Sequence, residues 1–391
     1  MSGDVAGERA SLWRSRGVLA LVGVTVLGFA SFALTLASLP TYAVAGGASP
    51  STAGVVTAVL LLVTIAGQSV VPALTARFGT GPVLAAGLLA LGLPAPLYAL
   101  DDGLVWICAL SGVRGAGFAV LTVLGATLSA RVAPPGRRGE SIGVYGLAIA
   151  VPNMLAVPAG VALVLAGQVQ VLSWLAASPI LGLLLLPALM RSVGGEEVRG
   201  PAGSARAAAR AAVAPAVVLF VVTAAGGGLV TFLPIERPDG RVATAALLLW
   251  GLTAGVVRWL VGVLADRIGP SAPLLPGSLL VSAIGLALTG AGLWTGPVWV
   301  LVGSAVFGAG YGAVQNLTLL RAFARAGDGR TTAASAVWNG AFDAGTAVGA
   351  LLLGPLSGAV GLAGTFLVVA GGLAAALPLA SVANRPARAR A

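Results

Sequence analysis

The sequence predicts an all-α membrane protein with twelve transmembrane helices in two pseudo-symmetric bundles of six. Three observations predict it: a very apolar composition, long continuous apolar runs, and a match between the two halves of the chain. Of 391 residues, 58% are hydrophobic and only 9% are charged, whereas soluble domains carry about 25% charged residues. Lipid forces backbone polar groups into helices or closed barrels. Because the apolar runs do not alternate with polar residues, barrel strands are excluded.

Each apolar run is long enough to cross a bilayer, which takes about 20 residues. The expected spans are residues 17–39, 52–75, 82–100, 104–128, 140–164, 168–190, 213–235, 243–264, 272–292, 297–319, 332–355 and 361–383. The first run is longer than the apolar core of a signal peptide, so we expect it to remain as a helix. A polar stretch at 191–212 predicts a cytoplasmic linker between an N-terminal bundle, residues 1–190, and a C-terminal bundle, residues 213–391.

The charges of the loops predict an orientation. All 22 basic residues are arginine, which fits the coding bias of a high-GC bacterium. Most of them fall in the loops of one side, whereas the other side has Arg237 and Arg241 beside acidic residues. Positive loops stay in the cytoplasm. We therefore expect a multi-pass protein of the bacterial inner membrane with both termini cytoplasmic, and we ascribe the net charge of +10 to topology rather than to a nucleic-acid partner.

The composition also excludes several chemistries. The chain has no histidine and one cysteine, Cys108, so neither an internal disulfide, nor a typical metal site, nor a histidine-based catalytic arrangement is expected. A phosphate-binding G-x-x-x-x-G-K-[ST] loop is also missing from the sequence. We expect no cofactor, no metal and no enzyme activity. An intramembrane transferase would need a paired acid and base, which the scattered acidic residues do not provide.

The two halves match at a shift of 190 residues. Ala76-Arg77-Phe78-Gly79 aligns with Asp266-Arg267-Ile268-Gly269, Arg131 with Arg321, Gln68 with Arg258, and Asn153 with Asp343. Four coincidences in one register indicate duplication. Repeated halves of this kind place a substrate site between them, near the middle of the bilayer.

Residues 262–269, with the sequence GVLADRIG, resemble the G-x-L-A-D-R-x-G signature of the major facilitator superfamily. The resemblance implies a conformational latch made of Gly262, Asp266, Arg267, Gly269 and Arg321. Physical candidates for the partner of Asp266 are the N-terminus of a neighbouring helix and Arg321. The first half has Ala76 in the aspartate position, which predicts an asymmetric latch. A solvated turn is the alternative.

Further motifs point to a subgroup of that superfamily. Arg114-Gly115-Ala116-Gly117 resembles its intramembrane R-x-x-x-G motif, with one residue fewer between the arginine and the glycine, and the resemblance implies that Arg114 takes part in proton transfer. The fifth span contains Gly146, Pro152, Pro158 and Gly160 and is similar to the Gly/Pro-rich motif of drug and metabolite antiporters. The chain thus resembles bacterial proton-driven exporters over essentially its whole length.

Three ionisable residues fall within the spans: Arg114, Arg258 and Asp343. A charge at the bilayer centre costs about 2.5–3.5 kcal/mol on insertion scales, so each should face a cavity or a partner. Asp343 is the acid deepest in a span, and an apolar environment favours its protonated form. We therefore expect Asp343, with Arg114, to couple transport to protons. A static salt bridge of Asp343 with Arg114 or Arg258 is the alternative. Gln68 and Arg258 are expected at polar interfaces, although Arg258 is near enough to the cytoplasm to snorkel.

Other polar and aromatic residues of the spans are candidates for the lining of a substrate cavity: Asn153, Gln315, Asn316, Asn339, Tyr145 and Tyr311. Hydrogen bonding between helices is the alternative for the amides, and simple packing or anchoring at the membrane interface is the alternative for the tyrosines.

These residues and motifs predict a secondary active transporter working by alternating access. We expect a proton-coupled antiporter that exports a small amphipathic compound, drug-like or a metabolite, and that functions as a single chain in the lipid bilayer. The alternative is a proton symporter or facilitator importing a small organic solute or anion. Few hydrogen-bonding side chains occupy the spans, which disfavours a sugar, whereas Arg114 and Arg258 would suit an anion.

Overall fold

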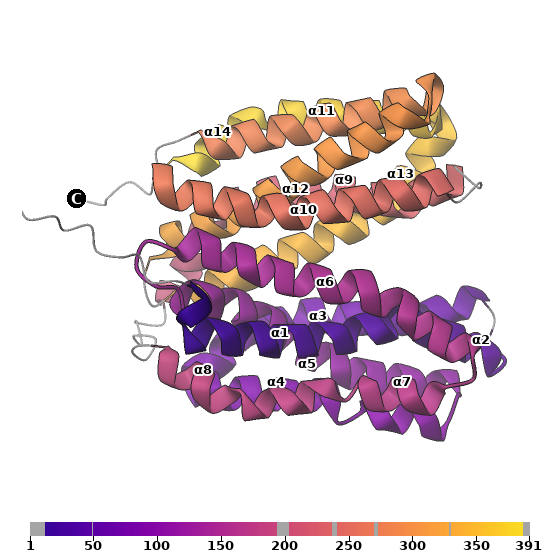
Figure 1. Cartoon of the computed structure of the whole chain (residues 1–391), viewed down its shortest axis with the longest axis vertical. Coiled ribbons are helices and arrows are strands. Elements are labelled where there is room, and N and C mark those ends of the chain that lie inside the picture. The colour runs from indigo at the N-terminus through magenta and orange to yellow at the C-terminus, as the bar shows by residue number, and fades with distance from the viewer. Residues whose placement is uncertain are drawn as a thin grey trace, which may run out of the picture.

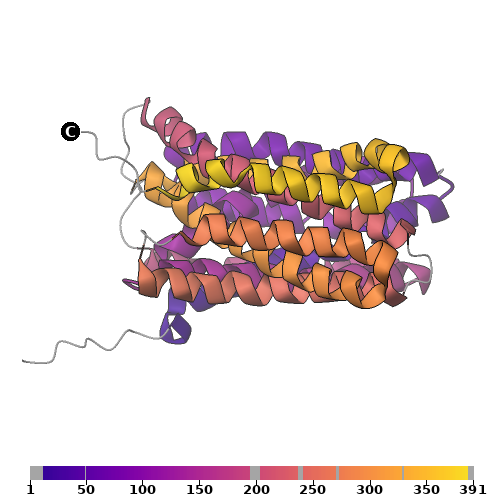
Figure 2. The ribbon, with the colours of Figure 1, turned by 90° about the horizontal axis from the view of Figure 1, so that it is seen from above.

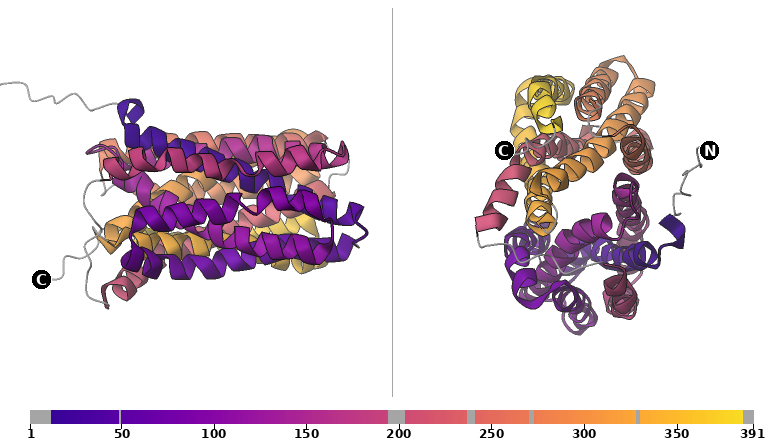
Figure 3. Two further views of the ribbon diagram at one scale, coloured as in Figure 1. Left: turned by 90° about the horizontal axis from the view of Figure 1, so that it is seen from below. Right: turned by 90° about the vertical axis from the view of Figure 1, so that its left-hand side faces the viewer.

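The computed structural model describes residues 12–48, 50–193, 203–236, 241–269, 273–327 and 330–385. Helices make up most of these ranges, short turns and loops connect them, and no strand occurs in them. The helices of residues 12–193, the first half, gather on one side of the molecule, and those of residues 203–385, the second half, gather on the other (Figures 1 and 3). Seen from above, the helices run in one common direction between two ends (Figure 2).

The first half begins with a short 3₁₀ helix, η1, and contains several interrupted spans. Its elements are η1 (Leu12–Arg14), α1 (Arg16–Leu36), α2 (Ser38–Ala45), α3 (Pro50–Phe78), α4 (Thr80–Gly92), η2 (Ala95–Leu100), α5 (Leu104–Arg131), α6 (Arg138–Leu165), α7 (Val169–Leu175), η3 (Ser178–Leu184) and α8 (Leu186–Ser192). The interruptions lie just before Pro94, Pro179 and Pro187, each at the start of the next helix, because proline lacks the amide that would continue the preceding helix.

The second half consists of longer helices. They are α9 (Gly203–Glu236), α10 (Arg241–Ile268), α11 (Leu274–Thr295), α12 (Pro297–Ala326), α13 (Thr331–Ala375) and α14 (Leu377–Asn384). Helix α13 is two helices joined at Gly361, whose φ of 73° is non-helical. Residues 203–212, which fall in the predicted linker, are part of α9. Residues 194–202 of that linker lie outside the described ranges, as do Arg237, Pro270 and Ser271.

Ten helical segments within the described ranges are long and apolar enough to cross a membrane, or eleven if the bent pair of Val169–Leu184 and Leu186–Ser192 is one span. The expected spans fall on helical parts of the chain, but 168–190 is divided among α7, η3 and α8, and 332–355 and 361–383 both include parts of α13. The last of the ten segments, Thr331–Asn384, is 54 residues long and contains the break at Gly361. Large apolar side chains such as Val105, Leu184 and Leu351 are more than 70% exposed, as expected of surfaces that face lipid rather than water.

The repeat between the halves is visible in the backbone. Gly79, after α3, and Gly269, after α10, both have a left-handed φ, 84° and 79° respectively. Glycine adopts this conformation without the steric penalty that a Cβ brings, and it commonly ends helices. The amide of each glycine donates to the carbonyl four residues earlier, Thr75 and Ala265 respectively. The aligned glycines therefore perform the same function in both halves.

One end of the molecule carries most of the charge. This arginine-rich end, which includes Arg14, Arg77, Arg131, Arg191 and Arg267, holds both the first and the last described helix (Figure 1). The opposite end carries Asp101, Asp102 and Arg241. Helices α6 and α10 lie side by side at the arginine-rich end and diverge toward the opposite end (Figure 1), so that the halves contact each other mainly at one end.

Glycines permit close helix contacts within the second half. A Cβ at Gly285 of α11 would collide with the backbone of Phe307 in α12, whereas a Cβ at Gly277 of the same helix would meet no atom within 4 Å. Contact between backbones drives helix association in lipid because the apolar side chains gain nothing by leaving it.

We expect Gly285→Ala to destabilise the protein and Gly277→Ala, its matched control, to leave it unchanged or slightly more stable. Overpacking of a close contact costs about 1–3 kcal/mol. At an uncrowded helical position, alanine favours the helix more than glycine does. Thermal unfolding of both variants in detergent measures the difference. Equal melting temperatures would show that the α11–α12 contact has room for a methyl group.

Candidate transport site between the two halves

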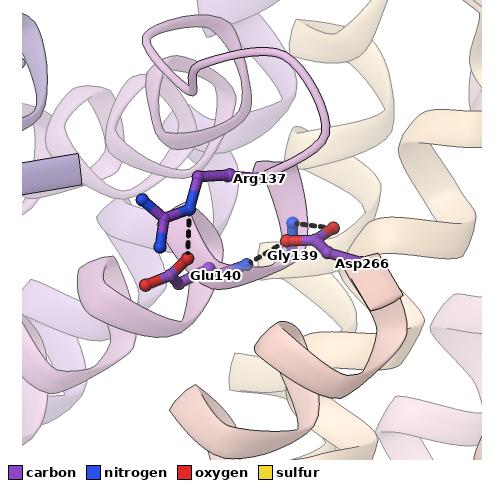
Figure 4. Close-up of polar contacts among 4 residues, drawn as sticks. All are labelled: Arg137, Gly139, Glu140 and Asp266. Atoms are coloured by element: carbon purple, nitrogen blue, oxygen red, sulfur yellow. Dashed lines mark hydrogen bonds and ion pairs between the residues drawn. The ribbon is translucent and has the colours of Figure 1, made fainter. Parts of the chain in front are cut away.

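Asp266 joins the two halves at the arginine-rich end (Figure 4). Its side chain, at the end of α10, accepts hydrogen bonds from the backbone amides of Gly139 at 2.9 Å and Glu140 at 2.8 Å, in the first turn of α6. The first amides of a helix have no intrahelical partner and carry the positive end of the helix dipole. The carboxylate therefore caps a helix of the other half.

Glycine lets α6 and α10 approach closely enough for this cap. A Cβ on Gly262 would collide with the carbonyl of Gly139, and one on Gly139 would lie 2.6 Å from the carbonyl of Gly262. Asn316 of α12 fastens the same contact, because its amide donates to the carbonyls of Gly139 at 3.0 Å and Arg258 at 2.9 Å. The signature glycine is thus required by the close approach of two backbones.

The other residues of the predicted latch lie near the ends of α10 and α12. Arg267 is exposed, and Gly269 ends α10. Arg321 is buried and donates to the side chain of Asn384 in α14 at 3.0 Å. Arg137 forms an ion pair with Glu140 at 2.7 Å, beside the amides that Asp266 caps (Figure 4).

Deeper between the halves, Asp343 of α13 meets Gln68 of α3. The Gln68 amide donates to the Asp343 carboxylate at 2.7 Å and lies 3.4 Å from the hydroxyl of Thr122 in α5. Gln68 is buried and Asp343 is partly exposed. The alternative of a static salt bridge is not what the structure contains, because Asp343 has no ion pair with either arginine in the described part of the chain.

Asn339 and Ser335, one and two turns before Asp343, extend this contact toward the arginine-rich end. The Ser335 hydroxyl donates to the carbonyl of Val123 at 2.7 Å, and the Asn339 amide reaches the carbonyl of Thr122 at 3.4 Å. In the described ranges, the hydrogen bonds between the two halves all lie in the portion of the helices toward the arginine-rich end. The structure is therefore closed at that end.

Arg258 lies at the same interface and is 6% exposed. Its Nη1 donates to the side-chain oxygen of Gln315 at 2.8 Å, and its guanidinium lies 5.9 Å from the ring centre of Trp338. On the other side it fills the space left by Gly146 of α6, where a Cβ would collide with the arginine side chain. The hydroxyls of Tyr145 and Tyr311 are near enough to interact with it electrostatically. Snorkelling, considered from the sequence, does not describe this enclosed side chain.

Arg114 is placed elsewhere. It is fully buried inside the first half, where Nη2 donates to the carbonyl of Ser31 at 3.1 Å and to its hydroxyl at 2.9 Å. The ring of Tyr98 lies 5.5 Å from its guanidinium carbon. The structure thus surrounds Arg114 with neutral groups of α1 and η2 and does not bring it together with Asp343.

The remaining candidates separate into two groups. Gln315, Asn316, Asn339, Tyr145 and Tyr311 lie at or beside the interface and are buried. Asn153 is partly exposed and donates to the carbonyl of Ile149 in its own helix at 3.0 Å. Sequence reasoning missed Thr122 and Ser335, and it placed Gly146 in the Gly/Pro-rich motif without relating it to Arg258. Ser335 lies one turn before Asn339, which was an available signal, whereas neither the position of Thr122 nor the contact of Gly146 with an arginine of another helix has a local signal.

Loss of the Asp266 cap should open the arginine-rich end. We expect Asp266→Asn, which loses at least one charged hydrogen bond of about 1.5–3 kcal/mol, to speed maleimide labelling of Ala126→Cys about tenfold or more in a Cys108→Ala background. Ala126 is fully buried in the core shared by the halves. Asp101→Asn, at the opposite end, is the control. Unchanged labelling in Asp266→Asn would show that the cap does not hold the halves together.

Comparisons with known proteins agree with this architecture. Residues 21–350 match the Major Facilitator Superfamily. Among solved structures, the fucose:proton symporter of E. coli has a TM-score of 0.72 at 14% identity, covering 95% of this chain and 99% of the other. A human organic anion transporter has a TM-score of 0.67 at 18% identity, covering 93% of this chain and 99% of the other. A proton:xylose symporter with a bound bromo-deoxyglucose has a TM-score of 0.70 at 18% identity, covering 96% of this chain and 95% of the other.

A search of curated protein sequences gave no significant match. At these identities the solved structures show a shared fold, and the match of the superfamily along most of the chain shows descent. The chain belongs to the major facilitator superfamily of membrane transporters.

Proposed function

We propose that the protein is a proton-coupled secondary transporter of a small organic solute, working by alternating access. In this proposal the last helical segment is two spans divided at Gly361 and the bent pair is one, which gives twelve spans in two six-helix bundles. The bundles are residues 1–190 and 213–391, joined by a linker. The arginine-rich end is cytoplasmic, the membrane is a bacterial inner membrane, and the transporter acts as a single chain.

The observation that carries the proposal is the hydrogen bond between Gln68 and Asp343. It joins the two halves, and the carboxylate accepts at 2.7 Å. A charged acceptor makes a stronger hydrogen bond than a neutral one, so protonation of Asp343 weakens a contact that holds the halves together. Proton binding and movement of the halves are thereby coupled through one side chain. Because Asp343 is partly exposed, a proton can reach it in this conformation.

The glycine contacts support a rocking motion. Backbones meet at Gly139 and Gly262 at the arginine-rich end, while α6 and α10 separate toward the opposite end (Figure 1). A conformation closed on the cytoplasmic side is one of the two states that alternating access requires. Asp266 would hold this state closed and release α6 in the other.

The direction of coupling has two candidates. The Gly/Pro-rich α6 favours proton antiport and export of an amphipathic compound. Two of the structurally similar proteins are proton symporters for fucose and xylose, and this likeness of fold favours proton symport. Arg258, which lies between the halves and forms no ion pair with any residue that the structure describes, also favours import of an anion with a proton, since the two neutralise each other.

We expect Asp343→Asn to abolish proton coupling while preserving the fold, because asparagine still accepts from Gln68. Proton release or uptake on addition of solutes to detergent-purified protein, over a panel of drugs and organic acids, measures this. Asp102→Asn is the matched control. Release by the wild type indicates antiport and uptake indicates symport. Proton exchange that persists in Asp343→Asn would refute the assignment of the coupling site.

A further inference from the structure

We propose that the Nε–Nη2 edge of Arg258 binds a carboxylate of the transported solute, and that the substrate class is organic anions with a flat apolar or aromatic body. This inference rests on the proposed transport function and names the substrate of the same interface.

The first argument is charge. Arg258 is 6% exposed and has no acidic partner among the described residues. A guanidinium does not lose its proton at ordinary pH, and a buried charge without a partner is strongly unfavourable. Arg258 therefore carries a positive charge that no acidic side chain of the described residues neutralises. The missing negative charge is what a substrate anion would supply.

The second argument is geometry. Of the three guanidinium nitrogens, Nη1 is engaged by Gln315 at 2.8 Å, whereas Nε and Nη2 have no partner. The hydrogens on Nε and Nη2 point in the same direction and form the fork that holds both oxygens of a carboxylate. Gln315 thus fixes the guanidinium by one nitrogen. Nε and Nη2, which suit bidentate binding, are buried in this conformation, with Nε against α6 at Gly146, so a carboxylate reaches them as α6 and α10 separate.

Arg114 lacks this arrangement, although it is also buried without an acid. Its Nη2 donates to Ser31, and the nitrogens without a partner are Nε and Nη1, which do not share a carboxylate-binding fork. Arg114 also lies inside the first half, between α1 and η2. The anion site is therefore assigned to Arg258 and not to the arginine that the family resemblance emphasises.

The third argument is position. Arg258 precedes the end of α10 at Ile268 by ten residues, or about 15 Å of helix, and Asp343 follows the start of α13 at Thr331 by twelve residues, or about 18 Å. The two groups thus lie at similar depth between the halves, where transporters of two repeated halves bind their substrates. An anion on Arg258 would lie in the same layer as the proton on Asp343.

Aromatic rings lie beside this position and indicate the rest of the ligand. Trp338 faces the guanidinium and stacks in turn with Phe342 at 6.0 Å. Tyr311, which interacts electrostatically with Arg258, packs in turn against Trp250 at 5.1 Å. Uncharged aromatic side chains offer contact to a flat apolar body and few hydrogen bonds to a polyol. An aromatic or similarly flat carboxylate fits this lining better than a sugar acid.

The test uses the full chain purified in detergent and calorimetric titration with benzoate and 2-naphthoate, compared with benzamide and 2-naphthamide. We expect the wild type to bind the carboxylates at least about tenfold more tightly than the amides, as one charged hydrogen-bonded pair implies. Arg258→Gln should lose this preference. Arg241→Gln, an exposed residue of the same helix, should keep it.

The substitution Gly146→Ala keeps the positive charge of Arg258 but displaces its guanidinium. The added methyl group would collide with the flexible end of Arg258, so we expect the fold to persist and the carboxylate preference to fall several-fold. Melting temperatures of Arg258→Gln and Gly146→Ala verify folding. If Arg258→Gln does not fold, Gly146→Ala alone decides, and an undiminished preference in it overturns the proposal.

Equal binding of carboxylates and amides by the wild type, no binding of either, or an undiminished preference in Arg258→Gln would also overturn it. Asp343→Asn separates this inference from the proposed function. A carboxylate preference that persists in Asp343→Asn without any proton exchange in the wild type would retain the anion site and reject proton coupling. Proton exchange with an uncharged solute would retain proton coupling and reject the anion site.

Discussion

An ionised side chain inside a membrane has no water to solvate it, and this constraint determines the interior of the molecule. Asp343, Arg114 and Arg258 each receive uncharged partners: Gln68 for the acid, Ser31 and Tyr98 for one arginine, Gln315 and Trp338 for the other. Neutral groups lower the penalty of burial without cancelling the charge. Two of the three charges lie between the halves, where they remain available to a proton or a solute.

Glycine makes these contacts possible. At Gly139 and Gly262 two backbones meet, and at Gly146 an arginine side chain crosses from α10 to α6. Larger residues would keep the halves apart and would leave Asp266 out of reach of the α6 amides. The Asp266 cap and the Arg258 contacts below it therefore depend on the same faces of α6 and α10. Separation of these faces at either place disturbs the contact at the other.

Much of the fold follows from hydropathy alone, because a span has to be long and apolar whatever it packs against. The helices at Arg241–Ile268 and Pro297–Ala326 begin within two residues of the predicted starts. Partners were harder to predict. That Arg114 points into its own half while Arg258 faces the other depends on how each helix is rotated, and that rotation is set by many weak packing contacts. The break at Gly361 coincides with the start of the last expected span, 361–383.

The two charges deep in the interface, Arg258 and Asp343, both belong to the second half, and at that depth the first half contributes neutral groups such as Gln68 and Gly146. Moving one elementary charge through the whole membrane potential is worth about 2.3 kcal/mol per 100 mV. With Asp343 ionised, the opposite charges at similar depth experience opposite electrical forces, which nearly cancel. A proton alone unbalances them, and a proton together with an organic anion restores the balance. Membrane voltage would then act on the half-loaded transporter and hardly at all on the empty or the fully loaded one.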